Sequence, residues 1–134
     1  MYAENAGAIF CQIRPPLPIF PNWISTLRVE SSFKHFFQST GQAYKLVLTN
    51  VDKIKHELDP AEFGAKVFTR KVEVMGHDGN MIAEIKGSVR EIEVGPGGEV
   101  EWFIVPVQTG KNLAMVCALK GHKEAGMVGT VTIN

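Results

Sequence analysis

The chain has 134 residues, of which 45% are hydrophobic and 21% are charged, and this balance fits one globular domain with its own hydrophobic core. Its 14 Lys and Arg residues equal its 14 Asp and Glu residues in number. That balance argues against nucleic acid as a partner, because phosphate neutralisation needs a basic excess. No apolar run in the sequence is long enough to predict a membrane span.

The N-terminal part of the chain is rich in proline. Residues 14–21 hold four of the seven prolines. Proline fixes φ and has no amide proton, so this segment should be extended and non-helical. We predict an N-terminal extension over residues 1–22 and one domain over residues 23–134. The extension either lies loosely on the surface or packs against the domain as a strand-like edge piece.

The rest of the chain consists mainly of short strand-like segments separated by glycine and proline turns. Alternation and β-branched residues predict strands at residues 26–30, 44–50, 67–75, 81–85, 91–94, 100–104, 113–117 and 130–133. One short helix is expected over Pro60–Ala65, with Asp59 as its N-cap and Pro60 in its first position. Many short strands with such turns predict an all-β sandwich or barrel.

The residues that carry chemistry lie near the C-terminus. Cys117, His122 and Met127 form a Cys-x4-His-x4-Met pattern on one predicted loop between two strands. Two histidines and a cysteine with a weak axial methionine are the ligand set of blue-copper sites. The spacing alone has a chance of roughly 1% in a chain of this composition, so it needs support from a fourth ligand elsewhere.

Three further histidines could supply that ligand. His56 is the strongest candidate, because it follows the predicted strand that ends at Asn50. His77 lies in a polar glycine-rich turn, where a solvated side chain is expected. His35, near Phe33 and Phe36, is more typical of a strand residue.

Three segments, in the expected order, resemble the cupredoxin family. They are Tyr-Lys-Leu-Val-Leu-Thr-Asn followed by Lys-Ile-Lys-His-Glu-Leu, Val-Gly-Pro-Gly-Gly-Glu-Val-Glu-Trp, and the ligand loop with its closing strand. The resemblance covers about residues 36–134 and implies a Greek-key β-sandwich with one copper ion per chain. It implies that His56, Cys117 and His122 are the equatorial ligands and that Met127 is the axial one. Glu57 departs from the small polar residue that many members have after the first histidine.

The same resemblance implies a function. We expect a monomeric carrier of single electrons, cycling between Cu(I) and Cu(II), that meets redox partner proteins transiently and acts in the periplasm or otherwise outside the cytosol. The start of the chain has no signal-peptide features, so either the protein stays inside the cell or a leader was removed. A thiolate copper carrier suits an oxidising compartment, and we therefore expect a native precursor with an N-terminal leader. Cys11 would then be a spare thiol, because Cys117 is needed as a ligand.

Other functions receive less support from the sequence. A multicopper oxidase would place histidines beside the cysteine, but Val116 and Ala118 flank Cys117. A binuclear copper centre would need a second cysteine on the loop, where position 121 is Gly. We therefore expect no enzyme. The alternative left open is a copper chaperone or store, or an accessory protein of periplasmic metal uptake.

Overall fold

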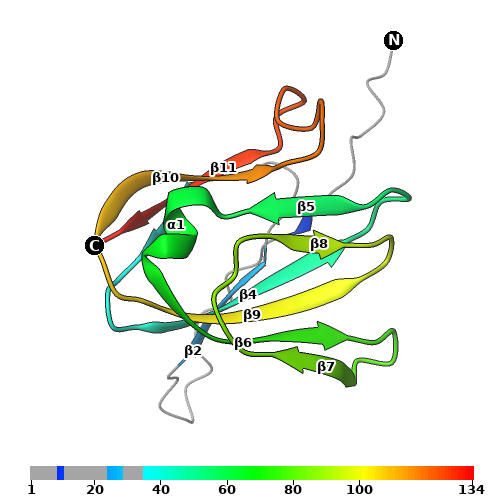
Figure 1. Ribbon diagram of the computed structural model, residues 1–134, viewed down its shortest axis with the longest axis horizontal. Helices are drawn as coiled ribbons and strands as arrows, with labels where there is room; N and C mark the ends of the chain where they lie inside the picture. Colours follow the sequence, from blue (N-terminus) through cyan, green and yellow to red (C-terminus); the bar gives the residue numbers. More distant parts are fainter. Residues whose placement is uncertain (1–8, 11–23, 29–34) are drawn as a thin grey trace.

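The computed structural model describes residues 9–10, 24–28 and 35–134 (Figure 1). Most of the predicted N-terminal extension, including its prolines and Cys11, lies outside these residues. The described part of the extension is β1 (Ile9–Phe10), which pairs with Thr49 and Asn50 at the end of β4. This short piece therefore joins the edge of a sheet.

The described residues form strands and one short helix. After β1 come β2 (Ile24–Arg28), β3 (His35–Gln38), β4 (Ala43–Asn50), β5 (His56–Asp59), α1 (Ala61–Ala65), β6 (Val67–Met75), β7 (Met81–Ile85), β8 (Ile92–Val94), β9 (Glu99–Pro106), β10 (Gly110–Cys117) and β11 (Val128–Ile133). No helix among the described residues is long and apolar enough to cross a membrane.

The strands build two sheets. One has the order β1-β4-β9-β6-β7, with β2 also paired to β4, and the other has the order β3-β11-β10-β5-β8. Most neighbouring strands are antiparallel, while β2 with β4 and β3 with β11 are parallel. The two sheets face each other in Figure 1, so the predicted all-β sandwich is confirmed.

Period-two alternation explains which side chains fill the space between the sheets. In β9 every second residue is buried, beginning with Val100. Trp102 is fully buried, its ring contacts Phe63 edge to face, and its Nε1–H donates to Thr69 Oγ1 over 3.0 Å. The helix α1 thus contributes one aromatic side chain to the core and fixes the connection between β5 and β6.

The predicted strands agree with the observed ones to within a few residues, and β6 and β7 have the predicted bounds. Two differences affect the region around the candidate ligands. The strand β5, which begins at His56, was not predicted. The helix begins at Ala61 with Pro60 as its N-cap, one residue later than expected, although Asp59 Oδ1 still accepts a hydrogen bond from the Ala61 amide.

Phe63 provides a test of this packing. We predict that Phe63→Ala lowers the free energy of unfolding by about 3–5 kcal/mol, because it leaves a cavity against Trp102. Glu62→Ala, an exposed position in the same helix, should change it by less than about 0.5 kcal/mol. Urea unfolding of both variants measures the difference, and equal losses would mean that α1 contributes to stability through its backbone alone.

Candidate metal centre

Two strands of the same sheet bring the candidate ligands together. In β5 the buried residues alternate with more exposed ones, so His56 and Leu58 face the interior and Glu57 faces outward. In β10 the same alternation turns Leu113, Met115 and Cys117 inward. Because Cys117 lies opposite Leu58 in the antiparallel pair, His56 and Cys117 are on the same face and near the same end of the sheet.

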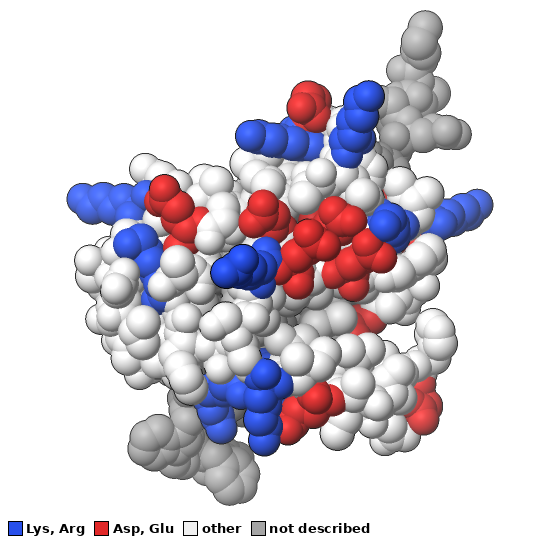
Figure 2. Space-filling view, in the orientation of Figure 1, with Lys and Arg blue, Asp and Glu red and all other residues white. Residues whose placement is uncertain are grey.

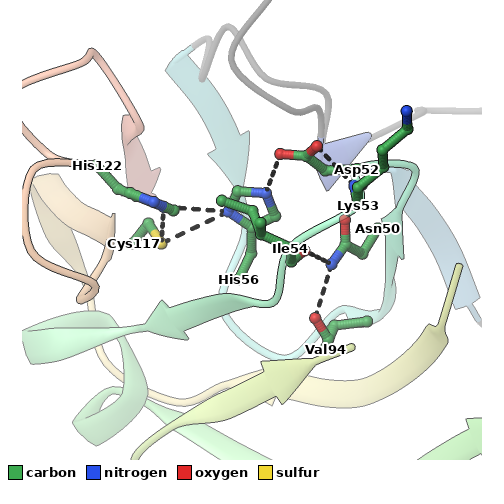
Figure 3. Close-up of polar contacts among 8 residues, drawn as sticks. All are labelled: Asn50, Asp52, Lys53, Ile54, His56, Val94, Cys117 and His122. Carbon is green, nitrogen blue, oxygen red and sulfur yellow. Dashed lines mark hydrogen bonds and ion pairs between the residues drawn. The ribbon is translucent and has the colours of Figure 1, made fainter. Parts of the chain in front are cut away.

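Three donor atoms converge at this end. His56 Nδ1 lies 3.2 Å from His122 Nδ1, and Cys117 Sγ lies 3.3 Å from His122 Nδ1 and 3.9 Å from His56 Nδ1 (Figure 3). His56 and Cys117 are each 1% exposed, whereas His122 is half-buried. An ion about 2.0–2.3 Å from each donor would hold two imidazole nitrogens and a thiolate at such separations.

The loop between β10 and β11 carries the rest of the candidate group and is closed by its own backbone. The Cys117 amide donates to the Met127 carbonyl and the Met127 amide donates to the His122 carbonyl, both over 3.0 Å. Gly121 and Gly126 have φ of 86° and 95°, the left-handed region that other residues adopt at a cost. Met127, at the end of the loop, is 3% exposed. His56, Cys117, His122 and Met127 thus form a group that could bind copper.

Asn50 fixes the other loop, which connects β4 to β5. Its side chain is fully buried, and Nδ2 donates to the carbonyl oxygens of Ile54 and Val94, each over 2.8 Å. Its Oδ1 accepts the Asp52 amide over 2.9 Å. Its backbone amide and carbonyl pair with Gly98 and Gly97. One residue therefore joins the end of β4, the loop before His56 and the turn after β8.

The second ring nitrogen of His56 also has a partner. His56 Nε2 lies 3.1 Å from Asp52 Oδ2 (Figure 3). An ionised carboxylate can only accept a hydrogen bond, so a neutral His56 that donates to it at Nε2 keeps its lone pair on Nδ1. That lone pair points at Cys117 and His122, as a metal ligand requires. The chemistry of the donor set therefore fits a copper ion or another thiophilic cation.

Glu57 belongs to a different surface. It lies directly opposite Glu93 in the β5–β8 pair, and together with Glu91 it forms a cluster of carboxylates. Figure 2 shows acidic side chains gathered over β5 and β8. Burial and the hydrogen bond with Glu93 raise the pKa of Glu57, whereas hydrogen bonds from Lys55 and Glu57 lower the pKa of Glu93. The residue that departs from the family pattern is thus outside the metal centre.

The structure brings together His56, Cys117 and His122, as the sequence predicted. Met127 ends the ligand loop at a buried position. His77 is exposed beside Gly97 and does not join the donor cluster, and His35 is in β3, where a strand residue was expected. Sequence reasoning missed Asn50 and Asp52 as supports of the site. The spacing of four residues between Asp52 and His56 was the available signal, but it is common in loops.

Comparisons with known proteins support the fold. No family model matches the chain, and no curated protein matches it in sequence. Among solved structures, a multicopper oxidase from Campylobacter jejuni described as a metallo-oxidase superposes with a TM-score of 0.56 at 18% identity, over 73% of this chain and 20% of the oxidase. A copper nitrite reductase from Nitrosomonas europaea has a TM-score of 0.56 at 15% identity, over 74% of this chain and 32% of the reductase.

A third structure extends the same result. The McoA multicopper oxidase from Aquifex aeolicus superposes with a TM-score of 0.53 at 16% identity, over 74% of this chain and 21% of the oxidase. The matched part of each of these proteins is thus between a fifth and a third of its length. With its two sheets and the His-Cys-His-Met group, this chain has the cupredoxin fold.

The role of Asn50 can be tested on the metal-free protein. We predict that Asn50→Ala lowers the free energy of unfolding by roughly 2–4 kcal/mol, because the buried bond to the Val94 carbonyl and the part-buried bond to the Ile54 carbonyl are lost together, and each loss costs about 1–3 kcal/mol. Thr49→Ala is the matched control, since Thr49 Oγ1 donates a hydrogen bond of 3.0 Å to the Glu99 carboxylate. Its loss should be about 1 kcal/mol or less. Urea unfolding gives both values, and similar losses would contradict the central role of Asn50.

Proposed function

We propose that this protein is a blue copper protein that carries single electrons. The observation that carries the proposal is the convergence of His56 Nδ1, His122 Nδ1 and Cys117 Sγ at one end of a β-sandwich. Bound copper would supply the one-electron couple between Cu(II) and Cu(I). The chain's own residues hold the donors, exclude water and offer a path to the surface.

The way the donors are held favours electron transfer. His56 and Cys117 belong to paired strands and are almost fully buried, so neither is free to move when the charge of the site changes. The ligand loop is closed at Cys117 and Met127 by a backbone hydrogen bond of 3.0 Å. Donors that keep their positions in both oxidation states of the metal lower the reorganisation energy of each electron transfer.

His122 is the proposed exit for the electron. It is the half-buried member of the group, and Ala118, Ala125 and Gly126 around it on the loop are exposed. Such a small apolar surface suits the transient, low-area contacts of redox partners. Lys120 and Lys123, also exposed, would steer the encounter in a salt-dependent manner.

We further propose that the protein acts in the periplasm or otherwise outside the cytosol, and that it is a carrier without enzymatic activity. Val116 and Ala118 stand beside Cys117, where a multicopper oxidase would have histidines. The alternative, a copper chaperone or store, would need ligands that release the metal easily. The burial of His56 and Cys117 favours the carrier, and resistance of the Cu(I) protein to a chelator would support it further.

The copper spectrum tests the proposed function. We predict that one equivalent of Cu(II) added to the metal-free protein produces an intense visible charge-transfer band from the Cys117 thiolate. Cys117→Ser should lose the band and keep the folded β-sheet spectrum in the far ultraviolet. The matched control is Ser88→Ala, a residue outside the donor cluster, which should keep the band. A colourless Cu(II) complex of the unmodified protein would refute the proposal.

The contribution of Met127, which would be a weak ligand of bound copper, is tested separately. We predict that Met127→Leu keeps copper and the visible band but raises the reduction potential, because a weak donor that favours Cu(II) is lost. Protein-film voltammetry measures the potential. Met115→Leu, a fully buried methionine on β10, is the matched control and should leave the potential near its original value. An unchanged potential in Met127→Leu would mean that Met127 only packs.

A further inference from the structure

We propose that Asp52 is a positioning residue that fixes the tautomer of His56 and lowers the reduction potential of the metal centre. The inference rests on the proposed function and adds to it the residue that tunes the buried ligand. It starts from one contact, the 3.1 Å separation of Asp52 Oδ2 and His56 Nε2.

The two oxygens of the Asp52 carboxylate have separate tasks. Oδ1 accepts the Lys53 backbone amide over 2.6 Å, and Oδ2 faces His56 Nε2. The Asp52 amide in turn donates to Asn50 Oδ1 over 2.9 Å. The carboxylate is therefore held by its own loop before any metal binds, and its orientation toward His56 does not depend on the metal.

This arrangement determines which nitrogen of His56 is the ligand. A neutral imidazole has one N–H and one lone pair, and the partner of the N–H selects the tautomer. Asp52 selects Nε2–H, which leaves the lone pair on Nδ1, the atom that lies 3.2 Å from His122 Nδ1. Without Asp52 the ring could protonate at Nδ1 and would then present a hydrogen to the metal centre.

The charge of Asp52 has a second effect. His56 is 1% exposed, so the hydrogen bond from its ring to the carboxylate is little screened by water, while the Asp52 side chain itself is 24% exposed. A carboxylate behind a ligating imidazole makes the imidazole a stronger donor. Stronger donation and a nearby negative charge both favour the more highly charged oxidised metal. Asp52 therefore lowers the reduction potential.

The first experiment uses the metal-free protein. Nitrogen-15 NMR of the His56 ring should show the Nε2–H tautomer in the unmodified protein and in Asp52→Asn, whose side-chain oxygen still accepts the hydrogen bond. Asp52→Ala should lose this preference and bind Zn(II) 10- to 100-fold more weakly, the usual effect of removing the partner of a ligating histidine. An Nδ1–H tautomer in the unmodified protein, or unchanged Zn(II) affinity in Asp52→Ala, would overturn the positioning role.

The second experiment measures the reduction potential of the copper-loaded protein. Asp52→Asn keeps the hydrogen bond and removes the charge, so the potential should rise. A tenfold greater loss of Cu(II) affinity than of Cu(I) affinity corresponds to about 59 mV. Glu93→Gln is the matched control, because Glu93, opposite Glu57 on the outward side of the same sheet, is the carboxylate whose pKa is lowered, and it lies outside the donor cluster. The control variant should shift the reduction potential by no more than a third of the shift seen in Asp52→Asn.

The outcomes separate the inference from the proposed function. Equal shifts in Asp52→Asn and Glu93→Gln would overturn the specific effect of Asp52, even in a protein with the full visible band. A protein that lacks the visible band would refute the blue-copper function, whereas the tautomer and the Zn(II) affinity would still decide whether Asp52 positions His56.

Discussion

The buried amide of Asn50 is the interaction on which the geometry of the metal centre depends. At Asn50 the chain leaves β4 and enters the loop that leads to His56, and a loop has no ladder of its own to hold it. The amide replaces that ladder with hydrogen bonds to Ile54, Val94 and the Asp52 amide. An unsatisfied polar group at this depth would be costly, so each of these bonds constrains the others. The loop before the first histidine is thereby anchored to the end of β4, to β8 and to the turn after it.

The two loops that position the ligands are held in place by different kinds of hydrogen bond. The loop from Cys117 to Met127 is closed by its own backbone, with two glycines in conformations that let it turn. The loop before His56 is held from outside, by a side chain that reaches across to the turn after β8. The conformation of the Cys117–Met127 loop therefore depends only on local sequence. The conformation of the loop before His56 depends on both sheets being in place.

This difference explains what could be predicted from the sequence. The strands with long alternating runs, such as β4, β6 and β9, were predicted because a period of two leaves a clear pattern. The candidate ligands His56, Cys117 and His122 followed from their spacing and the family resemblance. The strand β5 was missed because its four residues, His-Glu-Leu-Asp, are too few for a pattern, and only pairing with β8 and β10 makes them a strand. The support that Asn50 gives to the loop was missed for a similar reason. Asn50 and Val94 are 44 residues apart in the sequence, and a contact between such distant residues leaves no local sequence pattern.

The sequence separations of the ligands have a consequence for how the site is assembled. His122 is five residues from Cys117, whereas His56 is 61 residues away. Joining the ends of the longer segment costs about 2 kcal/mol more in chain entropy than joining those of the shorter one. An unfolded chain that meets a metal ion would therefore capture it first through the segment from Cys117 to Met127. Any such binding by the unfolded chain reduces the stabilisation that the metal gives to the native state. The ion therefore stabilises the fold by the amount by which all the donors of the native site together bind it more tightly than the unfolded segment does.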